Sequence, residues 1–268
     1  MPDRMPSILK KIVDKKRRRL DELKIERRLL ELKYRVKDMP GTKDFIRAIG
    51  NKSRVNIIAE LKRMSPSKGI IRKHFDILKI HRAYNEGGAD AISIVTEEDF
   101  FGGSLEYIRK IRNVTERPIL RKDFIFDPYQ VYEAREAGSD SVLLIASILS
   151  ENQLKELLEL SKELGMPALV EVHSKEELMV VLETDAEIIG INNRNLHTFE
   201  VNLQAAIEIN KHITDGRVVV SESGIQGAGD IKRLLDQGIY AFLIGEYFMR
   251  ADNIREAVRE LKNCYDQD

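Results

Sequence analysis

Charged residues stand at or just beyond the ends of several short apolar segments, where side chains can do chemistry. They are Glu60, Lys62, Lys122, Glu171, Arg194 and Glu222. Carboxylates and cationic groups brought together serve proton transfer and anion binding. A buried ion-pair network is the alternative, but an ion buried without a good partner costs several kcal/mol. A set of this size therefore indicates a functional site rather than part of a core.

The elements that must position these residues follow a repeating pattern. The segments at residues 86–92, 136–142 and 236–242 each read as a helix end, a glycine and a short apolar strand. Glycine suits the left-handed conformation of a helix C-cap. Recurring junctions of this kind indicate alternating strands and helices around a parallel sheet.

Eight segments have the length and composition of strands buried on both faces. They are residues 56–62, 90–96, 118–122, 141–146, 167–172, 188–192, 218–222 and 240–244. Eight strand–helix units favour a closed α/β barrel, the (βα)₈ or TIM barrel, over an open doubly wound sheet. The chain of 268 residues suits one such barrel, which takes about 250 residues.

Side-chain alternation along each strand decides which residues face the barrel interior. In the first strand Ile57, Ala59 and Leu61 form a wholly apolar face that must pack against helices, so Glu60 and Lys62 point inward. The same parity directs a further set inward: Lys122, Glu171, Asn192, Arg194 and Glu222. All lie toward the C-terminal ends of their strands, where barrels of this kind have their active sites.

Glycines follow the seventh and eighth predicted strands, in residues 221–225 (SESGI) and 243–246 (LIGE). Glycine lets backbone N–H groups approach an anion, and a helix N-terminus adds a favourable dipole. These two loops are the frequent phosphate site of (βα)₈ barrels. Although Gly224 and Gly245 could each serve only a tight turn, their joint occurrence predicts a phosphate site. Residues 65–69 (SPSKG) could add hydroxyls and a cation to it.

About 50 residues precede the first predicted strand. An amphipathic helical pattern runs through Ile8, Ile12, Leu20, Leu23, Leu30 and Phe45, so we expect residues 1–50 to form a helical extension of a single barrel domain that spans residues 1–268. The basic run at 15–19 (KKRRR) could be a nucleic-acid patch. Interleaved acidic residues favour the solvated face of a helix instead.

Composition excludes several classes of function. Lys plus Arg and Asp plus Glu are both 44, for a net charge of +0, which predicts no attraction to nucleic acid or to a membrane surface. No apolar stretch reaches the ~20 residues of a membrane helix, and the basic N-terminus lacks the apolar core of a signal peptide. The lone Cys264 excludes an internal disulfide and suits a reducing compartment. We therefore expect a cytoplasmic protein.

The sequence contains no recognisable metal or cofactor motif. The five histidines show no ligand spacing, and neither a dinucleotide nor an ATP motif is present. We therefore expect no metal and no cofactor. His173, two residues after Glu171, could be a catalytic base, but we interpret it as a polar loop histidine.

Six segments in chain order carry a resemblance to a known family. They are residues 58–67 (IAELKRMSPS), 96–103 (TEEDFFGG), 120–124 (LRKDF), 169–173 (LVEVH), 190–196 (GINNRNL) and 221–225 (SESGI). This set resembles that of the indole-3-glycerol phosphate synthases, and its first segment is the most diagnostic. The resemblance covers residues 56–250, and the helical extension is similar as well.

The resemblance implies a carboxy-lyase of tryptophan biosynthesis. Such an enzyme closes the indole ring of 1-(2-carboxyphenylamino)-1-deoxyribulose 5-phosphate and releases indole-3-glycerol phosphate, CO₂ and water. The implied partner is this small sugar phosphate, and neither a cofactor nor a metal is implied. The chain itself is expected to be a monomer or a weak homodimer.

The resemblance also implies roles for individual residues. The catalytic set is Glu60, Lys62, Lys122, Glu171, Asn192 and Glu222. Lys122 corresponds to the general acid that protonates the substrate ketone, because a lysine is protonated near neutral pH. Glu60 and Glu171 correspond to acid/base residues, Lys62 to the group that binds the substrate carboxylate, and Asn192 to one that holds sugar hydroxyls.

Further positions correspond to substrate contacts. The implied substrate-binding residues are Ser65, Phe124, Leu143, Arg194 and Leu196, and the implied phosphate-binding residues are Ser223, Gly224, Gly245 and Glu246. Phe124, Leu143 and Leu196 would form the apolar pocket for the anthranilate ring. Tyr247, Asn193 and Asn195 depart from the family's usual pattern, which bears on the phosphate site more than on the reaction.

Three other functions compete with this one. Phosphoribosylanthranilate isomerase uses a similar barrel but typically a catalytic cysteine, and Cys264 lies beyond the last strand. A non-catalytic barrel that binds phosphorylated ligands would usually have lost Lys122 or Glu171. A nucleic-acid binder conflicts with the balanced charge.

Overall fold

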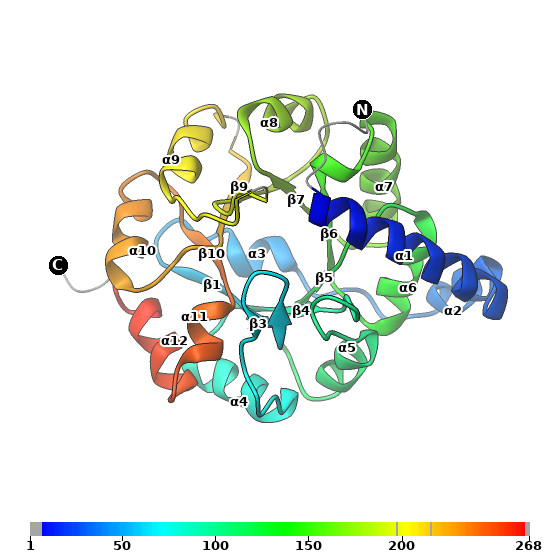
Figure 1. The fold of residues 1–268 in the computed structure, drawn as a ribbon, viewed down its shortest axis with the longest axis horizontal. Helices are drawn as coiled ribbons and strands as arrows, with labels where there is room; N and C mark the ends of the chain where they lie inside the picture. Colours follow the sequence, from blue (N-terminus) through cyan, green and yellow to red (C-terminus); the bar gives the residue numbers. More distant parts are fainter. Residues whose placement is uncertain (1–6, 197, 215, 266–268) are drawn as a thin grey trace.

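A computed structural model describes residues 7–196, 198–214 and 216–265. Eight parallel strands close into a barrel in the order β1-β10-β9-β8-β7-β6-β5-β4, surrounded by helices (Figure 1). The strands are β1 (Asn56–Leu61), β4 (Ala91–Val95), β5 (Ile119–Lys122), β6 (Ser141–Ile145), β7 (Ala168–Val172), β8 (Ile188–Asn192), β9 (Val218–Glu222) and β10 (Ala241–Ile244). The predicted (βα)₈ barrel is confirmed, and each predicted strand matches an observed one to within a residue at either end.

A helix follows each barrel strand and packs against its outer face. These helices are α4 (Ile77–Gly87), α5 (Leu105–Arg112), α6 (Pro128–Ala137), α7 (Glu151–Glu163), α8 (Lys175–Leu182), α9 (Gln204–Asn210), α10 (Ala228–Leu235) and α12 (Ile254–Lys262). A short helix, α11 (Glu246–Arg250), precedes α12, and a 3₁₀ turn, η2 (Ala146–Ile148), follows β6. Gly88 and Gly138 adopt φ values of 91° and 98° as C-caps, as the repeated junctions predict.

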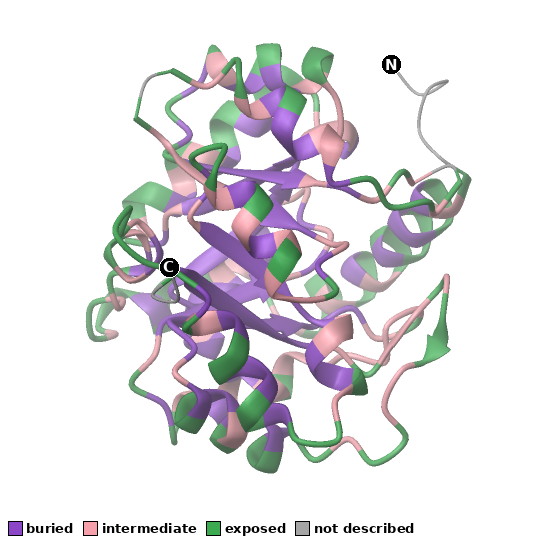
Figure 2. Cartoon of the chain, turned by 90° about the vertical axis from the view of Figure 1, so that its left-hand side faces the viewer, coloured by how far each residue is buried: buried purple, intermediate pink, exposed green. Residues whose placement is uncertain are grey.

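The barrel wall separates two apolar layers, and the buried strands lie between helices with exposed outer faces (Figure 2). The outer layer contains Ile57, Ala59 and Leu61 of β1, packed toward the helices. The inner layer contains Ile58 with Leu169 and its counterparts from other strands. The predicted facing of the strand residues is therefore confirmed, and the polar inward residues occupy the C-terminal ends of the strands.

Three helices precede the barrel: α1 (Ser7–Glu26), α2 (Leu29–Lys37) and α3 (Phe45–Ile49). Phe45 and Ile49 join the interior cluster together with Ala91 and Ala241, the first residues of β4 and β10. The helix α3 therefore closes the N-terminal end of the barrel, opposite the inward charges. The expected helical extension is present from Ser7 onward, and residues 1–6 lie outside the described residues.

The first two helices dock on α6, as seen at the right of Figure 1. Leu20 of α1 and Leu32 of α2 pack against Tyr129 of α6. The prediction from the amphipathic pattern that Leu30 belongs to the buried face was wrong. Leu30 is 75% exposed, whereas Leu32 is buried. A break between α1 and α2 shifts the register of the buried face, and this break is not visible in the periodicity.

One residue of the basic run is buried instead of solvated. Lys16 is 8% exposed, and its Nζ lies 2.8 Å from Oδ2 of Asp123, directly after β5. Asp123 also accepts hydrogen bonds from Thr96 and Arg121. Burial would raise the pKa of Asp123, but the charges of Lys16 and Arg121 outweigh it and hold this pKa well below its usual range. A buried ion pair thus joins the extension to the end of β5.

A two-stranded hairpin, β2 (Met64–Ser65) with β3 (Gly69–Ile70), interrupts the loop after β1. It places residues 65–69 beside the mouth of the barrel (Figure 1). Within the described residues, no helix has both the length and the apolar character needed to cross a membrane.

Replacing Lys16 tests the docking of the extension. Lys16→Met removes the ammonium and leaves a buried carboxylate with fewer partners, so we expect the free energy of unfolding to fall by about 3 kcal/mol. Denaturant titration at pH 7 measures it. Above the ordinary aspartate pKa of about 3.9 the ion pair contributes its full stabilisation. This stabilisation is lost as the pH falls toward the lowered pKa of Asp123 in the folded protein. The difference in the free energy of unfolding between the variant and the unsubstituted protein should therefore become smaller in acid.

Lys11→Met is the matched control, because Lys11 is exposed on the same helix. Surface substitutions of this kind change stability by less than about 0.5 kcal/mol. Equal stability of the two variants would contradict a stabilising role for the buried pair.

Candidate active site

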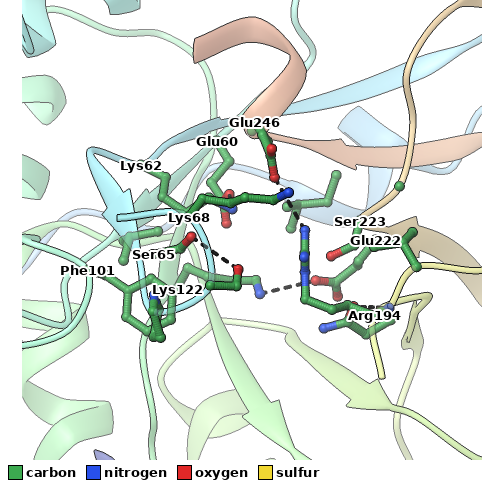
Figure 3. A pocket seen from close by; sticks show the side chains of 18 of the residues that line it. Glu60, Lys62, Ser65, Lys68, Phe101, Lys122, Arg194, Glu222, Ser223 and Glu246 are labelled. Atoms are coloured by element: carbon green, nitrogen blue, oxygen red, sulfur yellow. Dashed lines mark hydrogen bonds and ion pairs between the residues drawn. The ribbon is translucent and has the colours of Figure 1, made fainter. Parts of the chain in front are cut away.

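The inward charges surround a cavity of about 900 Å³ at the C-terminal mouth of the barrel. All fifteen residues that the sequence singled out line this cavity: Glu60, Lys62, Ser65, Lys122, Phe124, Leu143, Glu171, Asn192, Arg194, Leu196, Glu222, Ser223, Gly224, Gly245 and Glu246. They come from β1, β2, β5, β6, β7, β8 and β9, from the loops after the barrel strands, and from the start of α11. Side chains from opposite walls point toward one another across the cavity (Figure 3).

Lys122, the last residue of β5, is the central cation of the cavity. Its Nζ lies 3.1 Å from Oε2 of Glu171 on β7 and 3.1 Å from Oε2 of Glu222 on β9. Figure 3 shows Lys122 and Glu222 meeting from opposite sides. Burial lowers the pKa of Lys122, but Glu171, Glu222 and Glu60 more than reverse this, so the pKa is raised and the ammonium remains protonated.

The two carboxyl groups beside Lys122 have opposite pKa shifts. Burial raises the pKa of Glu171, but Lys122 and His173 outweigh it and hold this pKa well below its usual range. For Glu222 burial dominates, and the negative charge of Glu171 adds to it, so the pKa rises to about 8. At neutral pH Glu222 therefore favours the protonated form and Glu171 the ionised form. A pair of groups with pKa values pushed apart is a typical acid–base arrangement.

Glu60 and Lys62 of the first strand form an ion pair at the neighbouring wall of the cavity. Burial would raise the pKa of Glu60, but the charges of Lys62 and Lys122 lower it overall. Glu60 is 3% exposed, whereas the side chain of Lys62 is 19% exposed. The geometry leaves Lys62 nearer the mouth and Glu60 deeper in the barrel.

Two glycines leave room for these carboxyl groups. A Cβ atom on Gly190 of β8 would overlap Oε1 of Glu222, and a Cβ atom on Gly245 would overlap Oε2 of Glu60. The parallel register explains the first contact, since Gly190 pairs with Glu171 on one side while Asn192 pairs with Glu222 on the other. The sequence identified Gly245 as an anion-binding glycine. That Gly245 must also leave room for Glu60 is evident only from the fold.

The loops after β9 and β10 form one side of the mouth. Ser223 and Gly224 both adopt positive φ, 64° and 89°; this conformation is uncommon for serine and suits glycine. Gly245 precedes α11, whose first N–H groups have no acceptor within the helix. Arg194 lies 3.4 Å from Glu246, measured between Nη2 and Oε2. This side of the cavity thus offers the N–H groups at the start of α11 and a guanidinium.

The opposite side of the cavity is apolar. Phe124, Leu143 and Leu196 line it, as predicted, and the ring of Phe101 lies 6.0 Å from that of Phe124. Sequence reasoning missed the contribution of α1, whose Ile8, Leu9 and Ile12 also line the cavity. Their helical spacing indicated a buried face, but it contained no sign of what that face would cover.

The positions of Cys264 and His173 and a search for metal ligands bear on the competing functions. Cys264 is buried at the end of α12, where its Sγ contacts the carbonyl oxygen of Leu261 at 3.0 Å, and it does not line the cavity. His173 is a polar residue of the loop after β7, as expected, and it lies between Glu171 and Glu177. In the part of the chain that the structure describes, no group of three or more His, Cys, Asp or Glu side chains is arranged to hold a metal ion.

The fold and the site define a (βα)₈-barrel protein with acid–base groups and anion donors at the C-terminal mouth. A family model described as indole-3-glycerol phosphate synthase matches residues 9–261. The chain belongs to the indole-3-glycerol phosphate synthase family.

Curated relatives match this chain in sequence along most of their lengths. The indole-3-glycerol phosphate synthase of Alkaliphilus metalliredigens is 44% identical over 256 residues, covering 96% of this chain and 98% of the relative. That of Acetivibrio thermocellus is 51% identical over 219 residues, covering 82% and 84%.

Solved structures show the fold alone at lower identity. 3-Hexulose-6-phosphate synthase from Salmonella typhimurium has a TM-score of 0.66 at 13% identity, with 80% of this chain and 99% of that chain covered. A tryptophan synthase structure from Pyrococcus furiosus has a TM-score of 0.59 at 16% identity, with 78% and 98% covered.

The room provided by Gly190 can be tested directly. Gly190→Ala adds a methyl group that overlaps Oε1 of Glu222 and Cδ2 of Leu169, so the Glu222 carboxyl, which also contacts Lys122, must shift. We expect turnover by this variant to fall by about tenfold or more, because an ångström-scale misplacement in a site is costly. The measurement is a steady-state assay of the family reaction together with a thermal melt.

Gly229→Ala is the control, because Gly229 lies in α10 with no atom within 4 Å of the added Cβ. A folded Gly190→Ala protein with unchanged turnover would contradict the requirement for space at this position.

Proposed function

We propose that this protein is an indole-3-glycerol phosphate synthase that closes the indole ring of 1-(2-carboxyphenylamino)-1-deoxyribulose 5-phosphate. The products are indole-3-glycerol phosphate, CO₂ and water. Family membership supports the reaction, and the observation that carries the residue assignment is Lys122 held between Glu171 and Glu222 inside the cavity.

The first step is attack of the carboxylate-bearing ring carbon on the ketone carbon. Negative charge develops on the ketone oxygen, and Lys122 donates a proton to it as general acid. The carboxylates raise the pKa of Lys122, yet an alkoxide is more basic than a lysine, so the transfer becomes favourable as the charge develops.

The second step is loss of CO₂. Lys62 binds the substrate carboxylate at the mouth of the cavity, and its pairing with Glu60 holds it in place. The electrons of the broken carbon–carbon bond remain with the ring and restore its aromaticity. Glu60 then takes part in proton transfer.

The third step is dehydration, in which the new hydroxyl group leaves as water. It needs one proton for the departing oxygen and one base for the proton lost from the neighbouring CH₂ group. The opposite pKa shifts support a division in which protonated Glu222 donates and ionised Glu171 accepts. Asn192, paired with Glu222 in the sheet register, holds the sugar hydroxyls.

The remaining lining residues bind the two ends of the substrate. Ser223 and Gly224, with the backbone N–H groups of Gly245 and Glu246, bind the phosphate, supported by the helix start at α11. The apolar side formed by Phe124, Leu143 and Leu196 holds the anthranilate ring. The Arg194 guanidinium and the Ser65 hydroxyl line the cavity and add polar contacts to the substrate.

The wider properties of the protein are part of the same proposal. Residues 1–268 act as a single barrel domain, supported by the buried Lys16–Asp123 pair. A cytoplasmic location accords with a free buried cysteine. The protein is a monomer or a weak homodimer, and the exposed Ile25, Leu30 and Tyr34 offer apolar area for weak self-association; sedimentation analysis would measure it.

A turnover assay with the Lys122→Ala variant tests the assignment. Purified, EDTA-treated protein is mixed with the substrate, and the fluorescence of the indole product is followed. We expect rapid turnover by the unsubstituted protein and a loss of at least about 100-fold in Lys122→Ala, as for removal of a general acid. Lys110→Ala, which changes an exposed lysine of α5, should remain active.

Each outcome of this assay discriminates between functions. A folded, fully active Lys122→Ala protein would overturn the general-acid role. Substrate binding without turnover in the unsubstituted protein would favour a non-catalytic phosphate-binding barrel. Conversion of phosphoribosylanthranilate instead would favour the isomerase, against which the position of Cys264 outside the cavity argues.

The protonated state of Glu222 predicts a limit at alkaline pH. The pKa of Glu222 is raised to about 8, so the acid form is lost as the pH rises through this value. We expect kcat/KM, which reports the free enzyme, to fall above about pH 8. The profile is measured between pH 6 and 10 with the same fluorescence assay. Glu222→Gln should be slow and should lack this limb; an unchanged limb would contradict the assignment.

A further inference from the structure

His173 lies directly behind the carboxylate that the proposed reaction uses as a base. Its Nε2 is 3.2 Å from Oε1 of Glu171, and its Nδ1 is 3.3 Å from Oε2 of Glu177. Its side chain is only 12% exposed. The imidazole therefore bridges two carboxyl groups, one deep in the cavity and one near the surface.

Glu177 is held in this position by the start of α8. Ser174 is the N-cap, and its Oγ accepts a hydrogen bond from the backbone N–H of Glu177. The Glu177 carboxylate in turn accepts a 2.7 Å hydrogen bond from the backbone N–H of His173. The side chain of Glu177 is 25% exposed, so it lies between the imidazole and the solvent.

The contacts produce a row of alternating charge from the barrel interior to the first turn of α8. It runs from Lys122 to Glu171, then to His173 and finally to Glu177. Each oxygen of the Glu171 carboxylate has a different partner, with Lys122 at Oε2 and His173 at Oε1. A carboxylate flanked by cations at both oxygens has a strong preference for the ionised form.

We propose that His173 and Glu177 are positioning residues that hold the Glu171 carboxylate ionised and correctly oriented for proton abstraction. Glu177 keeps the imidazole cationic, and the imidazolium in turn holds Glu171. This inference rests on the proposed function, because it assigns a purpose to the base of that reaction.

His173 and Glu177 together explain which of the two neighbouring carboxyl groups, Glu171 or Glu222, carries the proton. Lys122 contacts both Glu171 and Glu222 at the same distance of 3.1 Å, so Lys122 alone does not discriminate between them. Of these two carboxyl groups, His173 contacts only Glu171, which favours the ionised form of Glu171 and the protonated form of Glu222.

Polar and charged groups around this unit come from four other strands of the barrel. Glu171 is faced by Lys122 from β5, Glu222 from β9, Glu60 from β1 and the amide of Asn192 from β8. His173 is faced by Glu171 and Glu177; burial lowers its pKa, but these two carboxylates outweigh it and raise it to about 10.

Kinetics of three variants test the role. His173→Leu removes the contact and should lower kcat by about 10-fold to 100-fold, the range for losing a group that orients a functional side chain, with KM little changed. His173→Gln, which restores a neutral donor near Oε1, should recover part of kcat. Glu177→Gln should lower kcat near neutral pH and move the acidic limb of its pH profile upward, because the pKa of Glu171 rises when the imidazole loses its charge.

Glu176→Gln is the matched control, since Glu176 is an exposed residue of the same helical turn with the same charge change. It should leave kcat and the pH profile unchanged.

A readout independent of turnover separates this inference from the proposed function. In ¹⁵N-histidine spectra, with the His173 signals identified by their absence from His173→Gln, the imidazole should remain doubly protonated at pH 8. In Glu177→Gln it should titrate nearer the ordinary histidine pKa of about 6.5.

A neutral His173 at pH 8 in the unsubstituted protein would overturn the inference, whatever the activity. So would unchanged kcat and pH profile in both folded His173→Leu and Glu177→Gln. Lack of any turnover by the unsubstituted protein, with a cationic His173 that depends on Glu177, would overturn the proposed function but retain the charge arrangement.

Discussion

The structure of the site depends on one buried ammonium group. Lys122 contacts Glu171 and Glu222 and lies near enough to Glu60 to lower its pKa, and its charge offsets part of the desolvation cost of placing these carboxyl groups in the barrel interior. Its strand ends at this residue, so the side chain reaches the cavity from rigid backbone. The chain then secures the same point from outside, because Asp123 pairs with Lys16 of α1. A functional group and the docking of the helical extension are thus adjacent in sequence.

The closed barrel turns this arrangement into a cavity with distinct walls. Because all strands are parallel, their C-terminal ends meet in one ring, and residues remote in sequence face one another across it. Small residues are needed wherever a long polar side chain crosses this ring, as at Gly190 beneath Glu222 and Gly245 beside Glu60. Large apolar side chains, including Leu169, fill the barrel interior beneath the charged layer, whereas glycines leave space within the site itself.

Much of this organisation could be read from the sequence, and the misses have identifiable causes. Strand positions and facing were predictable because buried parallel strands show continuous apolar runs and a strict period of two. The burial of Lys16 and the exposure of Leu30 were not predictable, since helical periodicity does not say which neighbour a face meets. The contact of His173 with Glu177 was likewise hidden, because it requires the turn from β7 into α8 to be folded.

The sequence by itself determined the fold class, the family and the list of residues around the cavity. These follow from local pattern: strand composition, glycine positions and the motif segments that carry the resemblance. The tertiary structure alone decided the pKa shifts. Glu171 and Glu222 are the same amino acid at equivalent strand ends, yet the pKa of Glu171 is lowered and that of Glu222 is raised. The physical reason is that a pKa depends on desolvation and on the sum of charges within a few ångströms, and both are set only when the barrel closes.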